Sequence, residues 1–334
     1  MLVFLAETGI LAIQVGMKTG LAPSRNRGAP AASAGGAWLR FWGVRGSIPT
    51  PGAETAGYGG NTTCVEVRVG SEIIILDSGS GIRPLGRALA EEFKEQPMRV
   101  SVLITHTHWD HIQGFPFFLP AYEAKNEVAL VGFKGARRSL QEAFSNQMGS
   151  PYFPISMEQM RCRLTIREIN GPGFKIGAVP VRAQFVNHPG KCAGYRLSTP
   201  GGDISFLPDA ELRRRPATPG EAAAALDTEH RKFAGDLKVL EFIRDSEVLI
   251  LDSQYNPEEH RTHLGWGHSC ADDSVVFAIK ANVKRLFLFH HDPDHDDEEI
   301  SRMLARAREQ AARRNSPLVI EAAREGLKVE LAKK

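Results

Sequence analysis

Apolar residues along the first third of the chain form patterns that predict β-strands. Leu39 to Val44 and Thr63 to Val69 alternate apolar and polar positions, which is typical of strands with one buried face. Ile73 to Leu76 is a continuous apolar run, as expected of a strand buried on both faces, and Val100 to Thr105 is predicted to be another. A helix is predicted between them, from about Pro84 to Glu95. The first of these two strands leads into an Asp-Ser-Gly loop and the second into a histidine cluster.

The rest of the chain continues as predicted strands separated by predicted helices, with no internal repeat. Pro216 to Glu229 is rich in Ala and Pro and is interpreted as an insertion. Strands are expected at Leu164 to Ile169, Val179 to Phe185, Ala193 to Ser198, Ile204 to Leu207, Val248 to Leu251 and Arg285 to Phe289, with a last strand near the end of the chain. Helices are expected at Phe133 to Met148, Leu237 to Arg244, Ala271 to Ala281 and Glu298 to Arg314. This mixture favours an α/β layered sandwich.

The composition is that of one globular domain with a sizeable core. Of the 334 residues, 42% are hydrophobic and 24% are charged, and the formal net charge is +2. A chain this close to neutral gives no indication of a nucleic-acid or membrane surface. The four cysteines, Cys64, Cys162, Cys192 and Cys270, form no Cys-x-x-Cys pair. This scatter argues against a disulfide framework or a cysteine-based zinc site, and it fits a reducing cytoplasm.

The N-terminal segment differs from the rest of the chain. Leu2 to Val15 is mostly apolar, but Glu7 interrupts it and no basic residue precedes it, which is the reverse of a secretory signal. The run is also shorter than the roughly 20 residues that a membrane span needs. Pro23 to Gly36 is rich in Ala, Gly, Ser and Pro, as in a flexible linker. We expect residues 1–37 to be a flexible or disordered extension, with an anchoring or docking role as the alternative.

Four side chains of metal-ligand type occupy six positions directly after the strand that ends at Thr105. They are His106, His108, Asp110 and His111. Side chains alternate along an extended segment, so His106 and His108 point the same way and can hold one metal ion. Asp110 and His111 come where the chain turns toward a helix, and they can reach a second ion nearby. The alternative is a histidine-rich surface turn without metal.

Further candidate ligands follow other predicted strands, which weighs against that alternative. His188, Asp209 and His290 each come just after a strand. His188 completes three histidines around one ion, and His290 joins Asp110 and His111 around the other, which leaves Asp209 to bridge the two. We prefer His290 to its neighbour His291 because His290 directly ends its apolar strand. Nitrogen and oxygen ligands suit two divalent ions, with zinc expected first and manganese or iron as alternatives.

These residues carry a resemblance to a known family. The motif His106-x-His108-x-Asp110-His111, followed by His188, Asp209 and His290, resembles the metallo-β-lactamase superfamily. Leu76-Asp77-Ser78-Gly79 resembles the first motif of that superfamily, whose aspartate usually supports a metal-bound histidine. The resemblance covers roughly Trp38 to Leu331. It implies a four-layer αβ/βα sandwich, with residues 38–334 as one hydrolase domain.

Other segments resemble one branch of the superfamily. Asn61-Thr62-Thr63, after a Gly-rich loop, and Gly267-His268-Ser269, before a helix, resemble transfer-RNA 3′-processing ribonucleases and related phosphodiesterases. A bacterial branch described as cyclic-nucleotide phosphodiesterase-like has sequences similar to three longer segments of this chain, Phe41 to Pro49, Gly265 to Ser269 and His290 to Pro293. The resemblance implies that two metal ions share a water and lower its pKa toward about 7 for attack on phosphorus or a carbonyl carbon.

The remaining candidate residues receive roles in this chemistry. Asp110 is expected to orient the hydroxide as well as to bind metal. His268 is our candidate for protonating the leaving alkoxide or for contacting the phosphate, with a structural role as the alternative. Asp77 is a candidate to support a metal-bound histidine, or else a turn residue, and Asp252 lies near His268 or the metals, or is structural. Asn61 is a candidate for substrate binding or for supporting the site.

The sequence therefore predicts a cytoplasmic, metal-dependent phosphodiesterase acting on a small nucleotide or cyclic phosphodiester. The alternatives are a lactonase, thioesterase or β-lactamase on the same fold, a transfer-RNA 3′-end endonuclease, and a non-catalytic module. No membrane is expected, and a nucleic-acid polymer is not favoured. A homodimer would be in keeping with related enzymes. His260, His263 and His295 are expected to be exposed to solvent, and Arg213 to Arg215 is interpreted as a solvated face.

Overall fold

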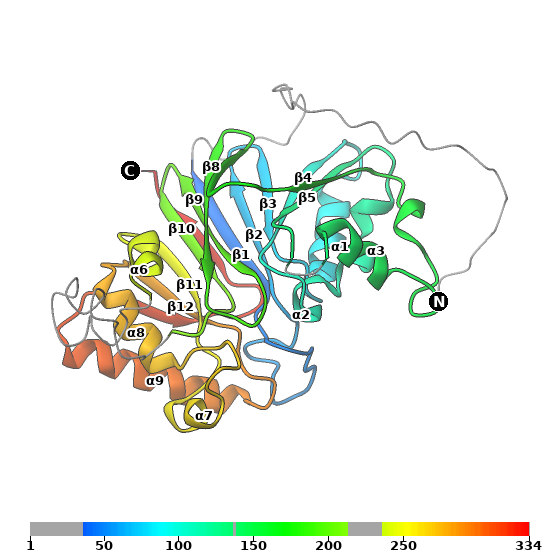
Figure 1. Ribbon diagram of the computed structural model, residues 1–334. Helices are drawn as coiled ribbons and strands as arrows, with labels where there is room; N and C mark the ends of the chain where they lie inside the picture. Colours follow the sequence, from blue (N-terminus) through cyan, green and yellow to red (C-terminus); the bar gives the residue numbers. More distant parts are fainter. Residues whose placement is uncertain (1–35, 136–137, 213–235, 334) are drawn as a thin grey trace.

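The computed structural model describes residues 36–135, 138–212 and 236–333, which form two seven-stranded β-sheets packed face to face (Figure 1). The first sheet has the order β14-β1-β2-β3-β4-β5-β6 and the second the order β13-β12-β11-β10-β9-β8-β7. The strands of the first sheet are β1 (Ala37–Gly43), β2 (Cys64–Val69), β3 (Glu72–Leu76), β4 (Arg99–Ile104), β5 (Glu127–Gly132), β6 (Arg163–Glu168) and β14 (Lys328–Leu331). Those of the second are β7 (Gly173–Ile176), β8 (Val179–Val186), β9 (Cys192–Thr199), β10 (Gly202–Leu207), β11 (Val248–Asp252), β12 (Arg285–Phe289) and β13 (Val319–Ala322).

Helices cover the outer face of each sheet (Figure 1). On the first sheet, α1 (Ile82–Glu92) and α3 (Leu140–Gln147) bury their apolar sides against the strands. On the second, α6 (Leu237–Ile243), α8 (Ala271–Lys280) and α9 (Asp297–Arg313) do the same. The short helices are α2 (Trp109–Ile112), α7 (Pro257–Thr262) and the 3₁₀ turns Phe115–Phe117, Leu119–Tyr122 and Met157–Gln159. The order helix, sheet, sheet, helix confirms the predicted four-layer sandwich.

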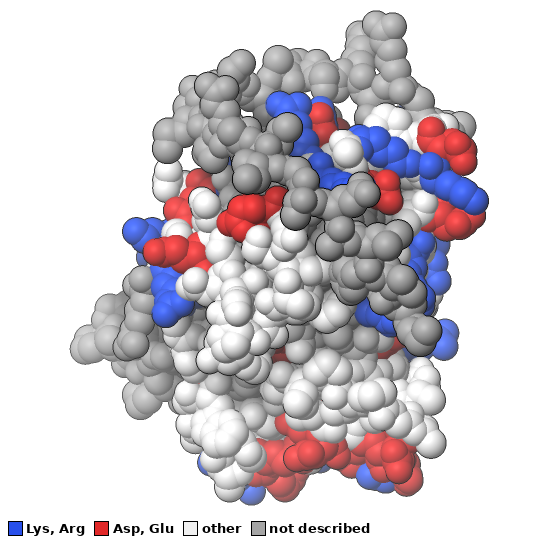
Figure 2. All heavy atoms as spheres, turned by 90° about the vertical axis from the view of Figure 1, so that its right-hand side faces the viewer, with Lys and Arg blue, Asp and Glu red and all other residues white. Residues whose placement is uncertain are grey.

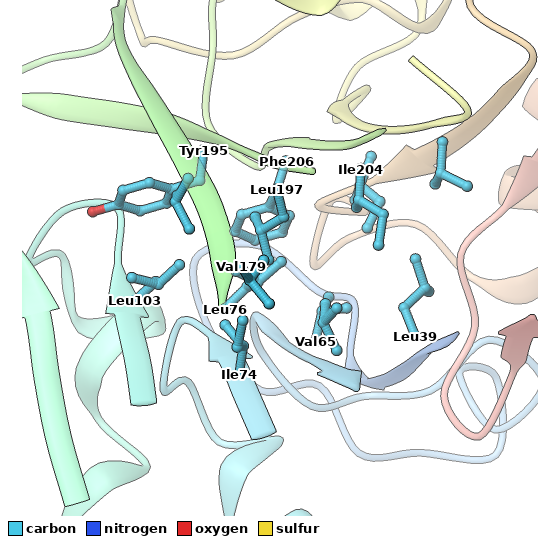
Figure 3. Close-up of a cluster of buried hydrophobic side chains, with 14 of the residues drawn as sticks. Leu39, Val65, Ile74, Leu76, Leu103, Val179, Tyr195, Leu197, Ile204 and Phe206 are labelled. Carbon is cyan, nitrogen blue, oxygen red and sulfur yellow. The ribbon is translucent and has the colours of Figure 1, made fainter. Parts of the chain in front are cut away.

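The main core lies between the two sheets. Leu39, Val65 and Ile74 of the first sheet face Tyr195 and Ile204 of the second, and all five are completely buried (Figure 3). In β1, buried and half-buried positions alternate strictly, as the pleat of a strand requires. Burial of apolar surface contributes about 25 cal/mol per Å². This packing therefore fixes the relative position of the sheets and of the loops at their edges.

Strand direction gathers the polar loops at one edge. Strands β10, β11 and β12 are parallel neighbours, and β8 runs in their direction because it is two antiparallel steps from β10. In the first sheet, β3 and β4 are also parallel. Parallel strands present their carboxyl ends at the same edge of a sheet, which is where binding sites form. The predicted ligands after β4, β8, β10 and β12 are therefore brought to one place.

Several sequence predictions differ from the structure. The helix expected at Phe133 to Met148 begins only at Leu140, because Ser139 caps it and forms a capping box with Glu142. Strands β5 and β7 were not predicted, and the single strand expected at the chain end is two, β13 and β14. His260 and His295 are buried instead of exposed, with 8% and 5% of their surface accessible.

Some sequence predictions lie outside the described residues. These are the flexible extension at residues 1–37, of which only the last two residues are described, the insertion at Pro216 to Glu229 and the basic run Arg213 to Arg215. Within the described ranges, no helix is both long and apolar enough to cross a membrane.

Candidate metal centre

Seven side chains from four segments, which follow β4, β8, β10 and β12, form two adjoining groups of metal-ligand type. His106, His108 and His188 share the first group with Asp209, and the second consists of Asp110, His111, His290 and the same Asp209. Within each group the ligand atoms lie within 4.8 Å of one another. The structure thus brings together all seven residues that the sequence predicts to be metal ligands. Because Asp209 belongs to both groups, it is placed to bridge two ions.

The two oxygens of Asp209 face different histidines. Its Oδ1 lies 2.9 Å from His111 Nε2 and 3.3 Å from His290 Nε2. Its Oδ2 lies 3.5 Å from His188 Nε2 and 3.7 Å from His106 Nε2. One oxygen is therefore directed to each group, as a carboxylate between two cations requires.

Unpaired polar atoms in the cluster show that its residues fit metal ions. His106 Nε2, His111 Nε2 and Asp209 Oδ1 are buried without a hydrogen-bond partner, since His111 and Asp209 are close but not in hydrogen-bond geometry. Leaving a buried polar atom unpaired costs about 1–3 kcal/mol. Here the unpaired atoms are imidazole nitrogens and a carboxylate oxygen that converge. Imidazole nitrogens and carboxylate oxygens are ligands of divalent transition metals, and bound ions would satisfy these atoms.

The electrostatics of the cluster favour ionised carboxylates beside a charged His111, whose pKa the carboxylates of Asp209, Asp110 and Asp77 raise against the effect of burial. Burial lowers the pKa of His106, and the nearby charge of His111 lowers it further, which keeps a nitrogen lone pair free for metal. Burial alone would raise the pKa of Asp110, but interactions with His111 and His290 outweigh it and hold this pKa below its usual range. The same balance holds the pKa of Asp209 well below its usual range. Both carboxylates are therefore charged and ready to bind cations.

Asp77 holds one of the candidate ligands in place from behind. Its Oδ2 lies 2.8 Å from His111 Nδ1 and accepts the hydroxyl of Thr105 at 2.8 Å, and its Oδ1 accepts the backbone N–H of Thr105 at 2.8 Å. A contact through Nδ1 leaves His111 Nε2 directed at the cluster. The backbone of Asp77 is left-handed, with φ 59°, as is that of His290, with φ 62°. Such conformations cost of order 1–3 kcal/mol in a non-glycine residue and concentrate at functional sites.

The Asp77→Asn substitution is expected to weaken metal binding by about 10–100-fold, the usual effect of removing a partner of a metal-bound histidine. Asparagine keeps the volume of the side chain but cannot hold His111 through a charged oxygen. Titration of metal-free protein with zinc against a competing chelator measures this affinity. Unchanged affinity in a correctly folded Asp77→Asn variant would show that Asp77 is only a turn residue.

His268 lies beside the second group and is paired with Asp252. Its Nδ1 is 2.7 Å from Asp252 Oδ2, and its ring stacks on that of His290 with 4.9 Å between the centroids. Burial lowers the pKa of His268, but the Asp252 carboxylate more than offsets this and raises the pKa to about 9. Asp252 is itself fixed by the backbone N–H groups of Ala210 and Ser269. The arrangement presents a protonated imidazole at the edge of the metal centre.

The structure separates the two neighbouring histidines at the end of β12. His290 Nε2 lies 3.1 Å from Asp110 Oδ2, and its Nδ1 lies 3.1 Å from Gln254 Oε1. His291 instead points away, with its Nε2 2.8 Å from the carbonyl oxygen of Ala323. Burial lowers the pKa of His291 to about 3. His290 is therefore the one that reaches the cluster.

Asn61 is not brought into either ligand group. Its Nδ2 donates to Glu325 Oε2 at 2.9 Å, and its Oδ1 accepts from the Ser80 hydroxyl at 3.0 Å. The backbone carbonyl of Asn61 accepts from Val44 and Arg45. These contacts tie the loop after β1 to the rest of the first sheet.

Glu211 is a supporting residue that the sequence did not indicate. Its carboxylate accepts the backbone N–H groups of Gly265 and Gly267 at 2.9 and 3.0 Å. The carbonyl of Gly267 in turn lies 2.9 Å from His188 Nδ1. Gly267 has φ 96°, and a Cβ there would lie 2.4 Å from the His188 ring, so this position requires glycine. Glu211 thereby holds both His188 and the loop that carries His268.

A cleft opens onto the metal centre. It has a volume of about 490 Å³, within the range typical of small-molecule sites. Its walls include Trp109, 76% of whose surface is exposed. The other lining residues are Ser47, Thr107, His108, Asp110, Asp209 and His268. The cleft thus gives access to residues of both ligand groups and to His268.

Comparison with known proteins identifies the family. A model described as a beta-lactamase superfamily domain matches residues 73–291, which is more than half of the chain. The chain belongs to the metallo-β-lactamase superfamily. The predicted resemblance to this superfamily, and to its branch with transfer-RNA processing ribonucleases, is confirmed.

Curated relatives and solved structures are in keeping with that assignment. Ribonuclease Z of Pyrococcus horikoshii is 24% identical over 285 residues, covering 78% of this chain and 87% of the relative. Ribonuclease Z of Bradyrhizobium diazoefficiens is 24% identical over 298 residues, covering 80% and 94%. The short form of human tRNase Z has a TM-score of 0.57 at 16% identity, covering 88% of this chain and 99% of that one. A diphosphatase from the PhnP family has a TM-score of 0.57 at 18% identity, covering 89% and 98%.

Proposed function

We propose that this protein is a two-metal phosphodiesterase that cleaves a small nucleotide or cyclic phosphodiester. The observation that carries this proposal is the pair of ligand groups sharing Asp209, with the His268–Asp252 pair beside them. His106, His108 and His188 would hold one ion and the other three ligands the second, with Asp209 between them. When bound, two divalent ions supply an activated water and neutralise charge on the phosphate oxygens. Zinc is the proposed resident metal, with manganese or iron as alternatives.

The residues of the chain supply the remaining parts of the reaction. Asp110 is ionised and receives the backbone N–H of Ser47 at 2.9 Å on its Oδ2, which fixes the carboxylate that would orient the attacking water. His268 would give its proton to the leaving alkoxide, because it is held protonated by Asp252 at neutral pH. A phosphodiester with a poor leaving group needs such an acid.

The shape and charge of the cleft support a small substrate. Its volume of about 490 Å³ suits a nucleotide, and no Lys or Arg is found among its described lining residues. An exposed tryptophan such as Trp109 can stack on a base, which contributes about 1–3 kcal/mol per base. Figure 2 shows uncharged side chains across the middle of one face of the molecule, mostly Asp and Glu side chains at its lower end, and Lys and Arg side chains toward its top and sides. Binding of an RNA polymer depends instead on many Lys and Arg contacts to phosphate.

Transfer-RNA 3′-end cleavage is the second candidate, and the ribonuclease Z relatives favour it. Their similarity extends over most of their own length, so the substrate could be shared as well as the fold. The cellular location that we propose is the cytoplasm, since all four cysteines are free and buried, as in proteins of reducing compartments.

A direct comparison of substrates tests the proposal. We expect the metal-loaded protein to hydrolyse 2′,3′- or 3′,5′-cyclic nucleotides with a higher kcat/KM than a precursor transfer RNA carrying a 3′ trailer. Faster cleavage of the precursor at its 3′ end would assign the ribonuclease Z function instead. Inactivity on both diesters, together with hydrolysis of a lactone, thioester or β-lactam, would refute the phosphodiesterase.

A further inference from the structure

Three other buried side chains of metal-ligand type lie together near the metal centre. They are His260 in α7, Cys270 at the N-terminal cap of α8 and Asp273 in the first turn of α8. Each offers one ligand atom, and these atoms lie within 4.8 Å of one another. Zinc holds thiolate sulfur at about 2.3 Å and imidazole nitrogen at about 2.0–2.1 Å, so the ligand atoms of one ion lie about 3–4 Å apart. Small side-chain movements would bring the three atoms to that spacing.

His260 supplies independent evidence for a ligand. Only 8% of its surface is exposed, and its Nε2 is buried without a hydrogen-bond partner. A ring nitrogen that is buried without a hydrogen-bond partner costs the full free energy of its desolvation. Its ring is inclined by 27° to that of Tyr255, with 6.4 Å between the centroids. A metal ion at Nε2 would offset the cost that no protein group relieves.

The three residues also have access to solvent. They contribute to the wall of a cavity of about 710 Å³, together with His188 and Glu211. Cys270 and Asp273 are each 2% exposed, so they lie deep in this wall. The cavity gives an ion a route of entry. It also provides space for a water molecule as a fourth ligand.

We propose that His260, Cys270 and Asp273 form a third metal site, separate from the binuclear centre, for a single zinc ion. Zinc is the ion of choice because it accepts nitrogen, sulfur and oxygen ligands in a tetrahedral site. Magnesium, calcium and manganese disfavour thiolate. As the sulfur–zinc bond forms, the Cys270 thiol loses its proton to solvent, so binding strengthens as pH rises. The sequence had argued against a cysteine-based zinc site because the cysteines are far apart along the chain, but a single thiolate suffices here.

The position of this site suggests what the ion does. α7 ends at Thr262 and α8 begins at Ala271, and the loop between them carries His268 and the Gly267 carbonyl that contacts His188. An ion bound to His260, Cys270 and Asp273 would cross-link the two ends of that loop. The third site would therefore hold rigid the segment that supports the binuclear centre, without itself touching substrate.

Cobalt titration of the metal-free, full-length protein tests the site. Cobalt(II) replaces zinc, and its bond to a thiolate gives a charge-transfer absorption in the near ultraviolet. The binuclear centre, built from the described His and Asp side chains, gives no such band. We expect the wild-type protein to show the band and to bind one equivalent more than the binuclear centre takes. The Cys270→Ser variant should lose the band and about one equivalent.

Cys192→Ser is the matched control, because Cys192 is equally buried and its sulfur lies 3.6 Å from His106 Nδ1. It should keep the band and the full metal content, and His260→Gln should weaken binding of the last equivalent. Absence of the band in saturated wild-type protein would overturn the proposal even if Cys270→Ser does not fold. So would a folded Cys270→Ser variant that keeps the band. The readout is spectroscopic, so it does not depend on phosphodiesterase activity.

Discussion

Replacing Asp209 with alanine is expected to abolish hydrolysis and to remove metal from both ligand groups. Each oxygen of this carboxylate faces a different group, at 2.9 Å from His111 Nε2 and 3.5 Å from His188 Nε2. Loss of one charge-stabilising group in an active site already costs about 10²–10³ in rate. Loss of the bridge between two ions should therefore lower kcat/KM by more than about 10³-fold. Steady-state kinetics and metal analysis of the purified variant measure both effects.

Two further variants make this result interpretable. Asp209→Asn keeps the side-chain volume but not the charge, and it should lose activity nearly as completely as Asp209→Ala. Asp294→Ala removes an exposed carboxylate away from the two ligand groups and should behave as wild type. Circular dichroism establishes whether each variant is folded. A folded Asp209→Ala protein with full activity and two bound ions would contradict the assignment of this residue as the bridge.

The second large effect is expected from His268→Ala. The rate of cleavage should fall by about 10²–10⁴-fold for a diester with a poor leaving group, because the leaving alkoxide loses its proton donor. With a p-nitrophenolate leaving group, which departs without protonation, the rate should change little. Kinetics over a series of aryl and alkyl diesters measure how strongly the rate depends on leaving-group basicity. That dependence should become steeper in the variant.

The Asp252→Asn substitution tests whether His268 acts as a general acid or has only a structural role. Asp252 touches His268 Nδ1 at 2.7 Å and keeps the imidazole protonated. The variant should show a weaker form of the same leaving-group dependence while its metal content stays near that of wild type. An equal loss on good and poor leaving groups in both variants would indicate that His268 positions the site and does not transfer a proton.

The pattern of apolar residues predicted the strands of the layered fold well where those strands are fully buried. Continuous apolar runs such as Ile73 to Leu76 identified strands that are buried on both faces. β5, with the sequence Glu-Val-Ala-Leu-Val-Gly, and the short edge strand β7 were missed, because short apolar runs do not distinguish strand from loop or helix. The helix predicted from Phe133 began too early, because the capping serine at Ser139 has more influence than the apolar pattern before it.

The candidate ligands were visible in the sequence because each follows a strand that points to the same edge. His106, Asp209 and His290 are examples. The supporting contacts were not visible, because they join residues far apart in the chain. Glu211 reaches the backbone of Gly267, 56 positions away. The burial of His260 likewise depends on how α7 packs, which no local pattern indicates.

We propose that two metal ions held by these side chains cleave a phosphodiester. Hydrolysis of bis(p-nitrophenyl) phosphate, by protein stripped of metal and then restored with zinc or manganese, tests it most directly. We expect no turnover without metal and full recovery at two bound equivalents in the binuclear centre. A restored protein that binds its metal but leaves the diester intact would contradict the claim.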